Sequence, residues 1–404
     1  MPQQAARAAT PAEKLKSDNA ARRAIPPFFG MIDAVLVDSP AEYDFDGAVG
    51  RDQAYAAWLW IGRDVASDLI DIEAPFDPER SRPALESLMP ELLVRARDTL
   101  RTTEVNPDNL RRIKTQLGGE ANWSKLPVVL NALRCRTLLE KAQGFGRAAN
   151  NVADETGLTT ALQSMPIQDQ KVAALLMMAM AGQVANPSRL ITSAIRISGG
   201  AEEVMLIRAG FGPMVDALLA HAQNQVSPLT QVGTFGDMDL ICRSVERFHR
   251  LVRAVNGYVE LARGSRWSGI IATLTKTVSE KIEPKLQDVA PSLNIAMRRR
   301  EVGDRLDTDQ ILAALNGVYL LATVRDCRDS LALNTVFDQA WAQVGQALEI
   351  HLERYLELLR RDPGDKVASG RLDAAIKMAE LRFNAEYAEV LRRAKDSVER
   401  RQGS

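Results

Sequence analysis

Three aspartates with helical spacing are the first candidates for chemistry in this sequence. Asp64, Asp68 and Asp71 occupy positions i, i+4 and i+7 of GRDVASDLIDIE, which would place three carboxylates on one face of a helix. Carboxylate oxygens are the ligands that Mg²⁺ prefers, and a bound magnesium can in turn hold a diphosphate. The spacing therefore makes Asp64, Asp68 and Asp71 candidate metal ligands.

A metal site of this kind needs a second acidic element, and the sequence offers little for it. All-α isoprenoid synthases hold magnesium through a tight DDxxD cluster and a matching acidic set across a cavity. The nearest second set here is Asp237 and Asp239, which is better explained as helix capping. The other face of the first segment is apolar, so an ordinary amphipathic surface helix explains the same pattern more simply.

One glutamate–histidine pair is the other candidate for metal binding. Glu246 and His249 stand three residues apart, on neighbouring positions of one helical face. Di-iron bundles use two such motifs and two further glutamates, and Glu349-Ile-His351 has the wrong spacing to be the second. With three histidines in the whole chain, a structural role for His249 is favoured.

Other catalytic motifs are missing from the sequence. There is no GxSxG and no phosphate-binding loop, and the two GFG triplets at 144–146 and 210–212 are interpreted as helix stops. The cysteines Cys135, Cys242 and Cys327 are far apart and form no CxxC, which indicates reduced thiols. The sequence thus predicts no cofactor.

Clusters of arginine are the candidates for partner contact. Arg298, Arg299 and Arg300 form one run, and Arg360 and Arg361 form a second at the end of a long apolar stripe. The chain holds 51 Lys and Arg against 52 Asp and Glu, so its net charge is −1. A nucleic-acid partner is disfavoured, because such binders usually carry a basic excess. Acidic lipid and an acidic partner both remain possible contacts for these arginines.

The elements that must position these residues are predicted to be helices almost throughout. Apolar residues recur at steps of three and four, and no stretch is a convincing strand. Helices look short between about 50 and 230. From about 237 they look long, with a heptad pattern of apolar residues from Ile241 to Ala262. We therefore expect an all-α chain, with an irregular short-helix domain followed by an elongated antiparallel bundle of long helices.

The domain boundaries are predicted from this change from short to long helices. We expect a flexible N-terminal arm over 1–27, a globular short-helix domain over 28–230 and the long-helix bundle over 237–401. The run KVAALLMMAMAGQVA predicts a helix near 167–185 that is buried on all sides, because it has no polar face. It is too short for the ~20 residues of a membrane span. No transmembrane segment is predicted, and peripheral membrane contact stays open.

The sequence favours a function in assembly over catalysis. We expect a non-enzymatic helical module for protein–protein interaction, such as an adaptor, scaffold or regulatory subunit of a bacterial cytoplasmic assembly, with a protein partner or a second copy bound. The alternative is an all-α enzyme with a cavity between helices, using magnesium and a diphosphate at Asp64, Asp68 and Asp71. The two differ in whether these aspartates line a deep cavity or face water.

Overall fold

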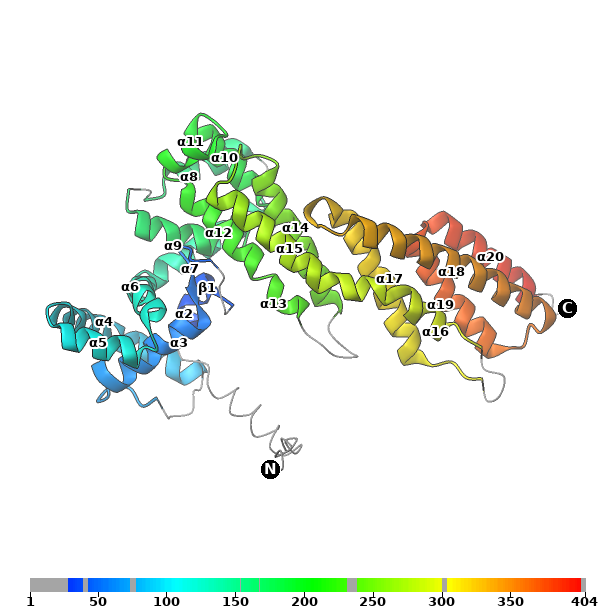
Figure 1. The fold of residues 1–404 in the computed structure, drawn as a ribbon, viewed down its shortest axis with the longest axis horizontal. Helices are drawn as coiled ribbons and strands as arrows, with labels where there is room; N and C mark the ends of the chain where they lie inside the picture. Colours follow the sequence, from blue (N-terminus) through cyan, green and yellow to red (C-terminus); the bar gives the residue numbers. More distant parts are fainter. Residues whose placement is uncertain are drawn as a thin grey trace, which may run out of the picture. The chain divides into compact units, whose positions relative to one another are not determined.

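The protein has an all-α fold, as the helical periodicity predicts (Figure 1). The computed structural model describes residues 28–38, 43–72, 78–152, 154–166, 168–230, 238–299 and 304–400. The predicted arm over 1–27 lies outside these residues. The chain divides into two compact units, Met1–His221 (unit 1) and Ala222–Ser404 (unit 2). The division falls within helix α12 (Gly212–Gln223), whereas the sequence pattern places the domain change after residue 230.

Unit 1 is built mostly from short and medium helices, but the helix Pro78–Glu104 has 27 residues and departs from the short helices that the sequence predicts here. Its helices and helical turns are α2 (Phe29–Ile32), the 3₁₀ turn η1 (Asp33–Val35), α3 (Arg51–Trp60), the π-helical turn η2 (Ile61–Val65), α4 (Pro78–Glu104), α5 (Pro107–Gln116), α6 (Glu120–Arg134), α7 (Arg136–Ala149), α8 (Glu155–Gln163), α9 (Gln170–Ala181), α10 (Ser188–Ser198), α11 (Glu203–Arg208) and α12 (Gly212–Gln223), which crosses the division.

Two very short strands also occur in unit 1, where the sequence indicates none. β1 (Leu36–Val37) pairs in parallel with β2 (Val49–Gly50), with Leu36 opposite Val49. Each strand is two residues long and fully buried. So short a run cannot show the alternation that marks a strand in sequence.

Helix α9 is buried within unit 1, as its composition predicts. Every residue from Val172 to Ala181 is buried. The Asp169 side chain caps the helix by accepting a hydrogen bond from the backbone N–H of Val172 at 3.2 Å. Helices α6 and α7 and the turn η1 pack on it. A helix without a polar face is stable only when neighbours cover all of it, and these elements supply part of that cover.

The first GFG triplet has a role other than the predicted helix stop. Gly144 and Gly146 both lie inside α7, and a Cβ built on Gly146 would collide with the backbone carbonyl of Met180 in α9. Gly146 therefore allows α7 and α9 to approach closely. In the second triplet, Gly210 has φ +86° and follows α11, so the predicted stop is confirmed there.

Unit 2 consists mainly of long helices. They are α13 (Val226–Leu229), α14 (Met238–Asn256), α15 (Arg266–Gln287), α16 (Val289–Ala296), α17 (Thr308–Cys327), the 3₁₀ turn η3 (Arg328–Ser330), α18 (Asn334–Arg361), α19 (Lys366–Arg382) and α20 (Ala385–Arg400). Helix α19 packs on α17, α18 and α20, and α16 packs on α17 and α18 (Figure 1).

The heptad pattern of α14 is shorter than the sequence predicts. Ile241, Val245 and Phe248 are buried, as expected of the apolar face. The helix ends at Asn256, however, so Val259 and Ala262 lie beyond it in irregular structure, and the predicted continuation to 262 is wrong. Among the described helices of the whole chain, none is long and apolar enough to cross a membrane.

Candidate functional site

The three aspartates proposed as metal ligands do not share a helical face. Asp64 lies in the π-helical turn η2, and the chain leaves helical geometry at Ala66, where φ is −145° and ψ is 45°. Asp68 and Asp71 come after this break. The expected helix through residue 71 is therefore wrong, because the chain turns back so that Ile70 and Ile72 pack against Gly62.

Each of the first two aspartates is held by a neighbouring helix of unit 1. The Asp64 carboxylate accepts a hydrogen bond from Gln116 Nε2 at 2.9 Å, and the Asp68 carboxylate pairs with Arg95 Nη1 at 2.6 Å. The Arg95 hydrogen bond also lowers the pKa of Asp68 below its ordinary value. Asp64, Asp68 and Asp71 are exposed to solvent. Over the described part of the chain, no three His, Cys, Asp or Glu side chains gather so that they could hold a metal ion.

Glu246 and His249 lie on α14 as the spacing predicts, but His249 has a structural contact. Its Nδ1 lies 2.9 Å from Ser330 Oγ in the turn η3. Burial is the main cause that lowers the pKa of His249. The imidazole therefore links α14 to the turn that follows α17, within unit 2.

The cysteine thiols are free and buried. Burial raises the pKa of Cys242 to about 11 and that of Cys327 to about 12. A thiol with such a pKa carries almost no thiolate at neutral pH, and the thiolate is the nucleophile. These two side chains therefore act as small apolar residues in the core of unit 2.

His351 is a buried histidine whose protonation should oppose folding. It is 7% exposed, its Nε2 lies 2.9 Å from Asn294 Oδ1, and its Nδ1 has no hydrogen-bond partner in the described structure. Burial lowers the pKa of His351 below 6.5, with a further contribution from Arg354. Because the unfolded chain then binds protons that the folded chain does not, stability is lost as the pH falls below about 6.5.

The prediction is that His351→Gln reduces this loss. The wild-type free energy of unfolding should fall between about pH 7.5 and about pH 5.5, and the fall should be smaller in the variant, in which His249 still contributes. Urea denaturation of the wild type and of the variant at the two pH values measures the free energy of unfolding of each. An identical pH dependence in the two proteins would contradict the assignment of the effect to His351.

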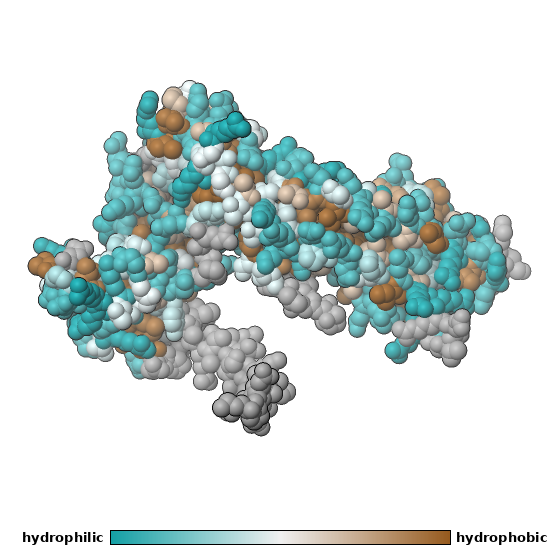
Figure 2. Space-filling model, in the orientation of Figure 1, coloured by the Kyte–Doolittle hydropathy of each residue, from teal (hydrophilic) through white to brown (hydrophobic). Residues whose placement is uncertain are grey.

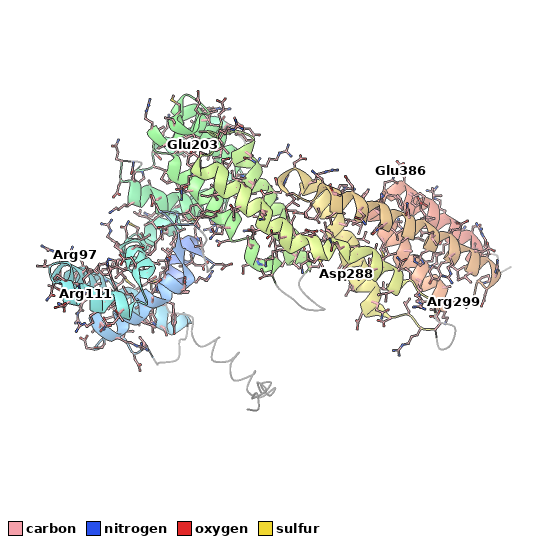
Figure 3. The ribbon with its side chains drawn as sticks, viewed as in Figure 1. Arg97, Arg111, Glu203, Asp288, Arg299 and Glu386 are labelled. Carbon is pink, nitrogen blue, oxygen red and sulfur yellow. The ribbon has the colours of Figure 1, made fainter. Side chains whose placement is uncertain are left out.

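Two arginines of the first run, Arg298 and Arg299, line a pocket in unit 2. This arginine pocket has a volume of about 580 Å³ and lies where the end of α16, the start of α17 and the first turns of α19 meet. Figure 3 shows Arg299 at this end of unit 2. Four arginines line the pocket, namely Arg298, Arg299, Arg305 and Arg371.

Arg371 forms the fixed base of the arginine pocket. It is 3% exposed, and its two terminal nitrogens each lie 2.7 Å from an oxygen of Asp304 in a bidentate ion pair. Its Nη2 also donates to the backbone carbonyl of Arg305 at 3.1 Å. The bidentate geometry holds the guanidinium in one orientation and attaches the segment before α17 to α19.

The other carboxylates at the pocket neutralise it only in part. Asp307 caps α17 by accepting from the Gln310 N–H, and Asp365 caps α19 in the same way. Arg299 lies 3.9 Å from Asp304 and 3.7 Å from Asp365. No described carboxylate forms an ion pair with Arg298 or Arg305, and both are exposed. The pocket therefore presents to an incoming anion two guanidinium groups that no carboxylate of the described residues pairs with.

Two of the four arginines that line the pocket, Arg298 and Arg299, are predicted from the sequence as contact residues. The sequence analysis misses Arg305 and Arg371, which come from other segments. A signal for Arg371 exists, because it interrupts the apolar side of α19 beside Ala368 and Leu372, all of them buried. A buried arginine must have an anionic partner, so this position predicts an ion pair, but the rule does not indicate which carboxylate forms it.

The remaining arginine candidates lie elsewhere. Arg300 is outside the described residues. Arg360 and Arg361 end α18 and pair with Glu357 one turn earlier, at 3.7 Å and 3.0 Å. They do not line the arginine pocket. The two arginine runs look equivalent in the sequence, but only the first lines the arginine pocket.

Comparison with known proteins gives no family for the chain. No protein-family model matches it, and neither the curated proteins nor the solved structures include a significant match.

Proposed function

We propose that this chain is a non-enzymatic helical module for protein–protein interaction, an adaptor, scaffold or regulatory subunit of a bacterial cytoplasmic assembly. In this proposal the arginine pocket of unit 2 contacts an acidic segment of a protein partner. The observation that carries it is the pair Arg298 and Arg305, which have no ionic partner among the described residues and lie beside Arg371, itself held by Asp304. Arginine is enriched at protein interfaces because its planar group binds carboxylates bidentately.

A protein partner fits the pocket better than a nucleic acid does. Asp304, Asp307 and Asp365 lie among the arginines and would repel a continuous phosphate backbone. The chain as a whole has no basic excess to hold a polyanion, since its net charge is −1. A short acidic segment, whose carboxylates reach Arg298 and Arg305 alone, avoids this repulsion.

The enzymatic alternative has no supporting observation at the aspartates on which it depends. Asp68 is engaged by Arg95, and Asp64 by Gln116, on the surface of unit 1. We therefore do not propose magnesium-dependent chemistry on diphosphates for this chain.

The test is affinity capture of the full chain from its native cells, compared with two matched charge reversals. Arg298→Glu with Arg305→Glu should reduce the recovered partner about tenfold, because the partner carboxylates would then face like charges. Arg360→Glu with Arg361→Glu removes the same number of arginines from the same unit and should leave the recovery unchanged.

Three outcomes would overturn the proposal. They are recovery of the chain alone, equal recovery by all three proteins, and loss of the partner only in the Arg360 and Arg361 variant. The last would move the contact to the end of α18. Far-UV circular dichroism of each variant establishes that a loss of binding is not a loss of fold.

A further inference from the structure

Unit 1 has an apolar groove that is separate from the arginine pocket. It lies between α4 and α6, which pack on each other, and has a volume of about 340 Å³. Its apolar walls are Leu93, Val94 and Leu100 from α4, and Pro127 and Leu130 from α6. Val94 is 48% exposed. Figure 2 shows brown, apolar residues at the surface of this part of unit 1, around α4 and α5.

The two walls have the geometry that receives a helix. On α4, the lining residues run from Leu93 to Leu100, seven residue steps along the helix, and on α6 they run from Pro127 to Arg134, again seven steps. At 1.5 Å per residue, each wall is about 10 Å long, or about two helical turns. A helix with apolar residues at i, i+3, i+4 and i+7 presents a stripe of the same length.

The charged side chains at the groove are positive, which favours an occupant that carries acidic residues. Its charged lining residues are Arg97 and Arg134, and none of its lining residues is acidic. Arg134 is oriented by Asn131, whose Oδ1 accepts from Nη2 at 2.7 Å and from Nε at 3.1 Å. Arg97 is 69% exposed and lies 3.8 Å from Asp98, also exposed, so this ion pair contributes little. Both guanidinium groups are available to an acidic partner.

We propose that the groove between α4 and α6 binds an amphipathic helix of a partner protein that carries acidic residues beside its apolar stripe. The apolar stripe lies between Val94 and Leu130, and the carboxylates pair with Arg97 and Arg134. The chain would then hold one protein contact on each unit. This inference is independent of the arginine pocket, because its residues all belong to unit 1.

The test is a charge swap with synthetic peptides and the full chain. A labelled helix of about 15 residues, with leucines at i, i+3, i+4 and i+7 and glutamates flanking them, is titrated by fluorescence anisotropy. A matched peptide has lysine in place of every glutamate. The acidic peptide should bind the wild-type chain at least about tenfold more tightly than the basic one.

The variants then locate the binding in the groove. Arg97→Glu with Arg134→Glu should reverse the preference, so that the basic peptide binds more tightly. Arg111→Glu is the matched control, since Arg111 is a surface arginine of α5, 84% exposed and outside the groove (Figure 3). It should retain the wild-type preference.

The peptide titrations overturn the inference in three cases. These are that the acidic peptide does not bind, that Arg97→Glu with Arg134→Glu leaves the peptide preference unchanged, or that Arg111→Glu shifts the preference as much as the charge swap does. A concentration-dependent dimer of the wild-type chain that Val94→Glu abolishes would also overturn it, and would assign the groove to a second copy.

Discussion

Replacing Asp304 by alanine is expected to lower the free energy of unfolding of unit 2 by about 3 kcal/mol. The cause is the charge left behind, since Arg371 is 3% exposed and Asp304 is its bidentate partner. The backbone carbonyl of Arg305 would remain as its acceptor, but a neutral carbonyl does not compensate a buried guanidinium. Hydrogen–deuterium exchange of α17 and α19 peptides measures the loss.

The complementary variant should be milder. Arg371→Met removes the buried charge itself and keeps an apolar chain of similar length in its place. It leaves Asp304, whose side chain is 18% exposed and has Arg299 at 3.9 Å. We expect a loss of about 1 kcal/mol, and partial recovery when Arg371→Met is combined with Asp304→Ala. Equal losses in the two single variants would contradict this account of the buried pair.

Replacing Gly146 by alanine is expected to destabilise unit 1 by about 2 kcal/mol through overpacking. The added methyl group would collide with the Met180 carbonyl, which belongs to the backbone of α9 and cannot move aside like a side chain. Helices α7 and α9 would have to move apart. Because α9 is buried within unit 1, the loss of stability should reach the helices that pack on it.

Gly144 is the matched control for this substitution. It lies two residues earlier in α7, and a Cβ built there meets no atom within 4 Å. Gly144→Ala should therefore stabilise the helix by about 0.5 kcal/mol, because alanine has the higher helix propensity. Urea denaturation of both variants compares them. Equal effects at the two glycines would show that helix propensity, and not the approach of α9, determines the result.

The burial of α9 in unit 1 can be predicted from the sequence. The run from Val172 to Ala181 has no polar side chain, so only a position buried on all sides is stable for it, and it is buried there. Gly146 is different, because glycine inside a helix and glycine after a helix look alike in sequence. The helix α9 that requires Gly146 is distant along the chain.

The failure at Asp64, Asp68 and Asp71 has a similar cause. No proline or glycine separates Asp64 from Asp71, so no residue in the segment indicates the break. The break arises from tertiary packing, in which Ala66 is fully buried and Ile72 contacts Gly62. Gly62 is the one local signal, since a glycine near a helix end often allows close approach of another segment.

The arginine pocket is formed by residues from distant segments, so a single run of residues in the sequence does not predict it. Arg298 and Arg299 are adjacent in sequence, but the pocket also requires Arg371, which is 67 positions from its partner Asp304. Periodicity places residues on one helix and does not indicate which helices meet. The sequence therefore predicts the kind of surface, and the packing of α16, α17 and α19 determines where it is concave.

Site-specific photo-crosslinking in the native cells tests the proposed contact most directly. A photoreactive phenylalanine analogue replaces Ile295, which lines the arginine pocket and is 57% exposed. The control replaces Val390 of α20, which is 63% exposed and outside the pocket. We expect one discrete protein adduct at position 295, lost when Arg298→Glu and Arg305→Glu are added, and none at 390. No adduct at 295, or the same adduct at both positions, would contradict the assignment of the arginine pocket as a protein-binding site.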